Sequence, residues 1–250
     1  MQNYCKTIGA LAAASALVAG NAKAEVEYQL HTGYTSEYIY RGVKLGNDMV
    51  EAGADVKTQF NGFNLSAGAW YGSFESDVLG LSATDLNVTE LDLYAEAAKD
   101  FGPVTGSIGY IYRMYDLDGV RDDTQEIYFG LSHDFGIVDV SLTYYWGVEG
   151  FSDALRGIGS TEGYTELALR RSFELSPCLN LNVGTNVGYL VEGGDFTAWT
   201  TKVALDWGFA EHAKLSPFVA LSVALGESTN TIWQQTDNQL VGGCMLSVNF

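Results

Sequence analysis

The sequence lacks the long apolar segment that a helical membrane protein needs. Its 250 residues are 47% hydrophobic, yet the mean hydropathy is only +0.02. No apolar run reaches the roughly 18 residues that a membrane-spanning helix requires, so a helical membrane protein is excluded. Proline is also scarce, at 3 residues, while 29 glycines and 15 tyrosines are typical of many strands joined by tight turns.

Basic residues are few as well. The chain has 13 lysines and arginines against 31 aspartates and glutamates, which gives a formal net charge of −18. A protein with this balance is a poor partner for nucleic acid, whose phosphates attract basic surfaces.

Histidine and cysteine are too sparse and too scattered to build a catalytic or metal site. His133 and His212 fall at or beside predicted turns, and only His31 is expected inside a strand. No Ser, Asp and His set converges at one strand end. The cysteines show no zinc-ligand spacing, and no glycine-rich loop opens a helix to hold phosphate. The sequence therefore predicts no enzyme, no metal and no cofactor.

The first 24 residues have the features of a cleaved signal peptide. Lys6 supplies positive charge, residues 8–20 form an apolar core, and Ala22-Lys23-Ala24 is a small-residue cleavage site before Glu25. Residues 25–250 are then expected to form one domain. Of the cysteines in that domain, Cys178 is predicted in a turn and Cys244 in the middle of a strand, and we expect no disulfide.

From Glu25 onward, apolar and polar positions alternate, which predicts β-strands. About twelve strands can be marked, most of them long enough to cross a bilayer at a tilt. Their predicted ranges are 26–35, 49–60, 63–73, 88–99, 104–114, 124–133, 137–146, 162–173, 179–190, 196–207, 213–225 and 239–250.

The lengths of the predicted connections depend on whether they follow an odd-numbered or an even-numbered strand. Even strands are followed by short turns, such as Asn61-Gly62, a strong hairpin signal. Odd strands are followed by connections that are mostly longer, over residues 36–48, 74–87, 115–123, 147–161, 191–195 and 226–238. Outer-membrane barrels show this asymmetry, with short periplasmic turns and long external loops.

Aromatic residues gather at both predicted rims, as the girdles of a transmembrane barrel do. The outer set is Tyr34, Tyr38, Tyr40, Trp70, Tyr71, Tyr110, Tyr112, Tyr115, Tyr144, Tyr145, Trp146 and Tyr189. The inner set is Phe60, Phe63, Phe101, Phe135, Phe173, Phe209 and Phe250. A secreted β-sandwich would also alternate, but it has no reason to form such girdles.

The last strand requires closure of the sheet. Leu240, Cys244, Leu246, Val248 and Phe250 alternate, and an unpaired strand edge in lipid leaves backbone groups unsatisfied. The predicted fold is therefore an all-β, transmembrane, antiparallel up-and-down barrel in the outer membrane of a Gram-negative-type bacterium. We expect Leu246, Val248 and Phe250 to act also as the signal for the barrel-insertion machinery.

The inward face of the predicted strands is charged. Its residues carry ten acids against four fixed cations, and they are Glu27, His31, Glu51, Asp55, Lys57, Glu90, Asp92, Glu96, Arg113, Glu126, Asp139, Glu166, Arg170, Lys202 and Asp206. Such a lumen must hold water or pair its charges. One interpretation is a narrow acidic channel through which small polar solutes or cations diffuse. The alternative is a closed structural or adhesive barrel that acts through its external loops.

Residues 33–73 resemble the opening of the TorF-type porin family of bacterial outer-membrane barrels. The likeness lies in Thr35-Ser36-Glu37-Tyr38, Arg41-Gly42, the glycine-rich second strand and Ala67-Gly68 through Trp70 to Ser73; Tyr71 and Gly72 depart from the usual pattern. The resemblance implies an outer-membrane channel with no catalytic residues to carry over.

Arg41 lies on the inward parity of an extended first strand, next to Tyr38 and Tyr40 on the outward parity. We expect Arg41 to anchor the first loop, or to narrow the pore mouth, by pairing with lumenal carboxylates.

Overall fold

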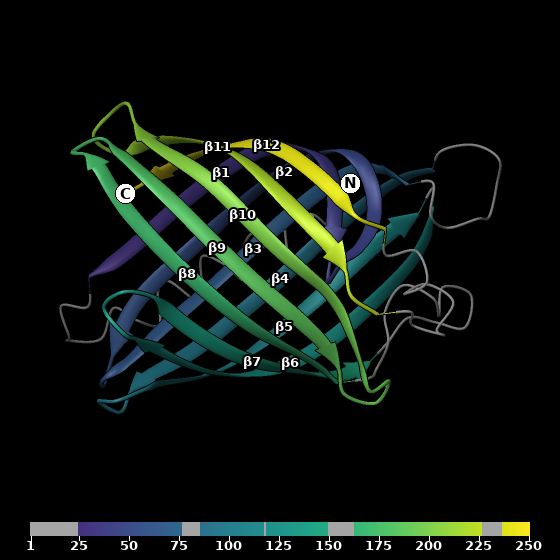
Figure 1. The fold of residues 1–250 in the computed structure, drawn as a ribbon, viewed down its shortest axis with the longest axis horizontal. Helices are drawn as coiled ribbons and strands as arrows, with labels where there is room; N and C mark the ends of the chain where they lie inside the picture. The colour runs from purple at the N-terminus through teal and green to yellow at the C-terminus, as the bar shows by residue number, and fades with distance from the viewer. Residues whose placement is uncertain (1–24, 77–85, 118, 150–162, 227–236) are drawn as a thin grey trace, which may run out of the picture.

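The computed structural model describes residues 25–76, 86–117, 119–149, 163–226 and 237–250. These residues form a closed antiparallel barrel of twelve strands, in which each strand pairs with its neighbours in the chain and β1 pairs with β12 (Figure 1). The predicted fold class is therefore confirmed. The described residues include no helix long and apolar enough to span a membrane. The predicted signal peptide lies outside them.

The twelve strands are β1 Val26–Tyr40, β2 Val43–Phe60, β3 Phe63–Ser76, β4 Leu86–Asp100, β5 Thr105–Leu117, β6 Val120–Asp134, β7 Asp139–Glu149, β8 Tyr164–Ser176, β9 Leu179–Leu190, β10 Asp195–Gly208, β11 Ala213–Ala224 and β12 Gln239–Asn249. Nine of the twelve strands are longer than the sequence pattern alone suggested, β9 has the predicted bounds, and β11 and β12 are each one residue shorter.

The barrel closes between its first and last strands. β1 pairs with β12 from Gln29↔Asn249 to Thr35↔Gly243. Beyond that ladder, Phe250 N–H donates to the carbonyl of Tyr28 at 2.8 Å, and Tyr28 N–H donates back at 3.1 Å. We call the rim that holds this junction the inner rim and the opposite rim the outer rim.

The outward face of the barrel is apolar, as its alternation predicts. Leu142, Trp146, Val219, Leu221 and Leu240 are all exposed there. The seven phenylalanines of the predicted inner girdle are exposed as well. This surface suits contact with acyl chains.

Residues 36–48, predicted as a long loop, are instead mostly strand. β1 continues to Tyr40 and β2 starts at Val43, so only Arg41 and Gly42 form the turn. β1 has no β12 partner after Thr35, and β2 meets β3 only from Asn47. Residues 36–46, here called the inward hairpin, thus leave the wall while they remain paired with each other.

Irregular backbone occurs within the inward hairpin and at its junction with the wall. The β1–β2 register shifts between Tyr38 and Ile39, and the β2–β3 register shifts between Asn47 and Val50. Between these last two, Asp48 has a φ of +51° and accepts a hydrogen bond from the Tyr34 hydroxyl. Bulges of this kind bend a strand and increase its twist.

The inward hairpin fills the outer part of the lumen with apolar side chains. Val43 and Leu45 from the hairpin pack with a buried cluster contributed by several strands, whose other members are Met49, Phe74, Val88, Tyr115, Leu117, Tyr164 and Leu190. This cluster explains why the hairpin resembles a loop in sequence. Its apolar residues face the interior of the barrel rather than lipid, so they do not continue the outward pattern of β1 and β2.

Two further predictions are wrong at the outer rim. Residues 115–123 are not a loop, because β5 runs to Leu117 and β6 starts at Val120. The outer aromatic set also divides between the two faces. Tyr34, Tyr71, Tyr110, Tyr144 and Trp146 are exposed outward, whereas Tyr38, Tyr40, Trp70, Tyr115 and Tyr145 pack in or against the interior cluster.

Candidate functional site

The tip of the inward hairpin is a two-residue turn in a strained conformation. Arg41 has a φ of +52° and Gly42 a φ of +87°, as a type I′ hairpin turn requires. A side chain at Gly42 would place its Cβ 2.4 Å from the Cβ of Ala198 on β10. The tip therefore crosses the lumen from β1 and β2 and touches the opposite wall.

Arg41 is fixed at this tip by a carboxylate and three aromatic rings. Its Nη1 and Nη2 donate to Glu126 Oε1 and Oε2 on β6, at 2.7 and 2.9 Å. Its guanidinium carbon lies 4.3 Å from the ring centre of Tyr164, 4.7 Å from that of Tyr145 and 4.8 Å from that of Tyr40. Paired hydrogen bonds and cation–π contacts of this kind are strongest away from water.

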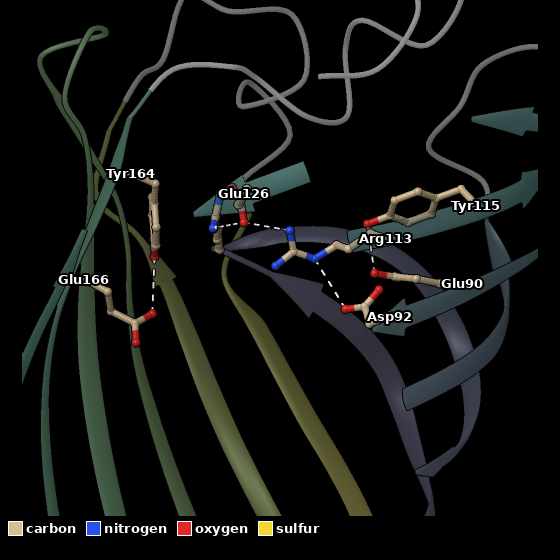
Figure 2. A network of polar contacts seen from close by, with 8 residues as sticks. Glu90, Asp92, Arg113, Tyr115, Glu126, Tyr164 and Glu166 are labelled. Atoms are coloured by element: carbon tan, nitrogen blue, oxygen red, sulfur yellow. Dashed lines mark hydrogen bonds and ion pairs between the residues drawn. The ribbon is translucent and has the colours of Figure 1, made fainter. Parts of the chain in front are cut away.

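A chain of charged side chains continues from Glu126 around the wall (Figure 2). Arg113 on β5 donates from Nη1 to Glu126 Oε2 at 2.6 Å, and its Nε lies 3.4 Å from Asp92 Oδ2 on β4. The Tyr115 hydroxyl donates to Glu90 Oε1 at 2.8 Å. We call Arg41, Glu126, Arg113, Asp92 and Glu90 the ionic network.

The ionic network is packed with little access to water and is not fully satisfied. Glu90 is completely buried, and the side chains of Arg113 and Glu126 are each 7% exposed. Three carboxylates face two guanidinium groups, while Glu90 Oε2 and Asp92 Oδ1 have no hydrogen-bond partner among the residues that the structure describes. Buried groups left without a partner are rare and costly. The network therefore lowers the stability of the folded barrel somewhat while it holds the hairpin in one arrangement.

Other predicted lumenal residues form smaller contacts along the wall. His31 Nδ1 lies 3.4 Å from Asp55 Oδ2, and Asp55 Oδ1 accepts from the Tyr94 hydroxyl at 2.6 Å. Asp206 pairs with Lys214 at 2.7 Å. Glu51 Oε2 accepts from Trp70 Nε1 at 2.6 Å. These residues lie apart from the ionic network.

The remaining predicted lumenal residues line more open parts of the interior. Glu27, Lys57 and Glu96 border a cavity of about 810 Å³ at the inner rim. Asp139, Arg170 and Lys202 border a second, of about 560 Å³. Glu166 accepts from Asn186 Nδ2 at 3.0 Å and lines a third cavity, of about 310 Å³, beside the hairpin. Asn186, Thr200 and Lys202 line both the second and the third.

The sequence reasoning missed the aromatic part of this site. Tyr40 and Trp70 were assigned to the lipid girdle and Tyr164 to no role, yet all three pack in the interior. The available signal for the inward direction of Trp70 was the alternation within the predicted strand 63–73, where Trp70 has the opposite parity to Phe63 and Tyr71, which are exposed. Tyrosine is common at both a membrane interface and a polar interior, so residue type alone could not separate them.

A closed antiparallel barrel with an apolar outer face, a charged interior and aromatic rims is a transmembrane barrel of the outer-membrane class. The chain belongs to the Gcw_chp family, described as a bacterial protein of unknown function, whose profile matches residues 19–216. That match does not test the TorF-type resemblance, which stays a prediction. No curated protein matches the sequence.

Solved structures with this fold include outer-membrane channels. The COG4313 outer membrane channel from Pseudomonas putida F1 has a TM-score of 0.55 and 12% identity, with 91% of this chain and 95% of that chain covered. A Pseudomonas aeruginosa FadL homologue has a TM-score of 0.54 and 9% identity, with 90% and 89% covered. Identities this low establish similarity of fold alone.

The described residues contain no group of three or more His, Cys, Asp and Glu side chains able to hold a metal ion. Cys178 and Cys244 are both free thiols. A phospholipase A dimer from Salmonella typhi with bound calcium also matches, with a TM-score of 0.49, 16% identity and 90% of each chain covered. The expectation that the present chain is not an enzyme stays a prediction.

Proposed function

We propose that this protein is an outer-membrane channel for passive diffusion of small polar solutes, narrowed near its outer rim by the inward hairpin. The lumen is open at the inner rim, where charged side chains face water, and is packed where the hairpin crosses it. Solutes that pass the hairpin do so beside β8 to β12, through the cavity of about 310 Å³.

One observation carries the proposal: Asp139, Arg170 and Lys202 point into the barrel and remain exposed. A filled barrel would pair such charges with each other, because a lone charge away from water costs several kcal/mol. Exposed charges inside the wall require a hydrated lumen. Carboxylates also outnumber cations among the predicted lumenal residues, and this favours cations over anions.

The similar structures support the proposal at the level of the class. One of them is described as an outer membrane channel, and the TorF-type resemblance of residues 33–73 points to the same class. The second candidate, a closed structural or adhesive barrel, is favoured by the buried cluster and ionic network that fill the outer lumen. The external loops through which it would act, 77–85, 150–162 and 227–236, lie outside the described residues.

Conductance in a planar bilayer separates the two candidates. The refolded full barrel is expected to pass a small current whose reversal potential in a salt gradient favours cations. The matched variant replaces residues 38–45 by an Asn-Gly turn, which removes the constriction and leaves the wall intact. Its conductance is expected to rise several-fold with weaker selectivity. Absence of current in both proteins, once folding is verified by gel mobility, would refute the channel and favour the closed barrel.

A further inference from the structure

The cavity beside the inward hairpin has the properties of a binding site. It lies between the hairpin and the wall formed by β8 to β12, and it encloses about 310 Å³. Because the cavity lies where the hairpin crosses the lumen, a solute that passes the hairpin through it contacts its walls. This inference rests on the proposed channel function and names the class of solute that the constriction selects.

Lys202, Glu51 and Glu166 face this cavity without forming an ion pair with one another among the described residues, whereas Arg41 and Glu37, which also line it, are paired with Glu126 and Lys44. Lys202 lies with its Nζ 3.8 Å from the ring centre of Phe218, and no carboxylate among the described residues lies within 4.0 Å of it. Lys202 and Glu51 both line the cavity and form no ion pair with each other among the described residues, so space in the cavity separates the ammonium group from the carboxylate. A ligand placed in that space can contact both.

Two carboxylates at the cavity, those of Glu51 and Glu166, each have one oxygen engaged and one oxygen available. Glu51 Oε2 accepts from Trp70, and Glu166 Oε2 accepts from Asn186. The second oxygen of each has no hydrogen-bond partner among the residues that the structure describes, and neither is buried away from solvent. Two free carboxylate oxygens therefore face the same space as one free ammonium group.

The neutral part of the lining favours a ligand with an apolar portion. Trp70, Phe218, Met49 and Val241 contribute apolar surface, while Thr200 and Ser222 contribute hydroxyl groups. A pocket that is mostly apolar with a few placed polar groups is the usual form of a small-molecule site.

The arrangement of charges discriminates among ligand classes. A simple anion would meet the carboxylates of Glu51 and Glu166, and a simple cation would meet Lys202. A neutral sugar would leave the charged groups without a charged partner. We propose that the cavity binds small zwitterions of the α-amino acid class, with the ligand carboxylate on Lys202 and the ligand ammonium on Glu51 and Glu166, and that it is the selectivity site of the channel.

Equilibrium binding tests this proposal without requiring a current. Isothermal titration of the refolded barrel in detergent would compare L-phenylalanine with two analogues of the same shape. L-phenylalaninamide lacks the carboxylate, and 3-phenylpropanoate lacks the ammonium group. L-phenylalanine is expected to bind at least about tenfold more tightly than either, because each analogue loses one charge-assisted contact.

Substitutions in the cavity test which side chains bind the carboxylate and the ammonium group of the ligand. Lys202→Met is expected to weaken binding of L-phenylalanine about tenfold and to abolish its advantage over the amide. The double variant Glu51→Gln and Glu166→Gln is expected to abolish its advantage over 3-phenylpropanoate. Arg121→Met and Glu211→Gln, which remove exposed charges near the two rims, at the start of β6 and in the turn after β10, are matched controls and are expected to bind as the unmodified protein does.

The outcomes separate this inference from the channel function. Equal binding of the three compounds, no binding, or unchanged binding in Lys202→Met would overturn the zwitterion site, and a measured bilayer current would leave the channel standing. Binding with the expected discrimination but no current would support the site and refute the channel. Heat-dependent gel mobility of each variant shows whether it is folded.

Discussion

Arg41 occupies a backbone conformation that a residue with a side chain rarely adopts. The same geometry occurs at the inner rim, where Asn61 and Gly62 have φ values of +55° and +78°, and Asn-Gly is the favoured pair for this turn. A left-handed residue other than glycine or asparagine costs about 1–2 kcal/mol. The contacts of Arg41 with Glu126 and the tyrosines offset that cost. This indicates that an arginine at this position serves through its charge and not through its turn propensity.

Arg41→Asn tests that interpretation, because it supplies the preferred turn residue and removes only the charged contacts. We expect the hairpin to form but to be held less firmly, so that conductance rises and trypsin cleaves more readily after Lys44, whose side chain is now only 22% exposed. Arg113 still faces Glu126, so the stability loss should fall below the roughly 3–5 kcal/mol of a buried carboxylate left with no partner.

Arg41→Lys is the control for charge alone. Lysine keeps the positive charge but cannot form the forked pair of hydrogen bonds, so an intermediate effect is expected. If Arg41→Asn left both conductance and cleavage unchanged, the charged contacts of Arg41 would not be what holds the hairpin, and its apolar contacts would hold it instead.

At the scale of elements, the inward hairpin is the feature that the sequence could not show. The strand segments that cross the bilayer were predictable because lipid imposes alternation on one face and water on the other. Val43 and Leu45 are buried inside the barrel, so the apolar positions of the hairpin do not continue the lipid-facing alternation from which strands were predicted. The interspersed Arg41-Gly42 and Gly46-Asn47-Asp48 are turn-forming residues, and they predicted a loop where the chain forms a bent hairpin.

The candidate site likewise has a part that the sequence predicted and a part that it did not. Its charges could be assigned to the lumen from strand parity, since a charged side chain is excluded from the lipid face. Which charges meet depended on the path of the hairpin, because Arg41 reaches Glu126 only by crossing from β1 to β6. The inward direction of the tyrosines around Arg41 was not predictable. Tyr34 and Tyr40 lie on one strand at positions of the same parity, yet Tyr34 faces lipid and Tyr40 faces the interior, because a register shift lies between them.

Comparing alanine substitutions at two glycines tests how closely the hairpin tip approaches β10. Gly42→Ala and Gly62→Ala carry a similar backbone cost, because both glycines have positive φ. A Cβ at Gly62 meets nothing within 4 Å, whereas one at Gly42 lies 2.4 Å from Ala198 Cβ. We expect Gly42→Ala to lower the urea midpoint of unfolding and to raise conductance, and Gly62→Ala to lower the midpoint slightly without changing conductance.

Ala198→Gly in the Gly42→Ala background removes the opposing methyl group and is expected to restore conductance toward that of the unmodified protein. Failure of this rescue, or equal effects of the two glycine substitutions, would show that the tip does not press on β10 in the membrane.

At the scale of the molecule, closure depends on the junction between β1 and β12. Deleting Phe250 removes its two hydrogen bonds with Tyr28 and an exposed aromatic ring at the inner rim. We expect assembly into the heat-modifiable barrel to be impaired while export is unaffected, as measured by gel mobility and periplasmic accumulation. Phe250→Ala keeps the backbone bonds, and Phe209→Ala removes an inner-rim ring away from the junction.

The expected order of assembly defects is deletion, then Phe250→Ala, then Phe209→Ala with little effect. An equal defect in the first two would assign the signal to the ring alone and support its recognition by insertion machinery. Normal assembly of the deletion variant would show that the rest of the β1–β12 ladder suffices for closure.

The charges inside the barrel are divided unequally between its two halves. Of the predicted lumenal residues, β1 to β6 and their inward hairpin contribute seven carboxylates and three cations, whereas β7 to β12 contribute three carboxylates and two cations. Such a division produces an electric field across the lumen, perpendicular to the direction of transport. A dipolar molecule in this field has its lowest energy with its positive end toward β1 to β6. In the proposed channel, the wall would therefore orient a solute before the solute reaches the hairpin.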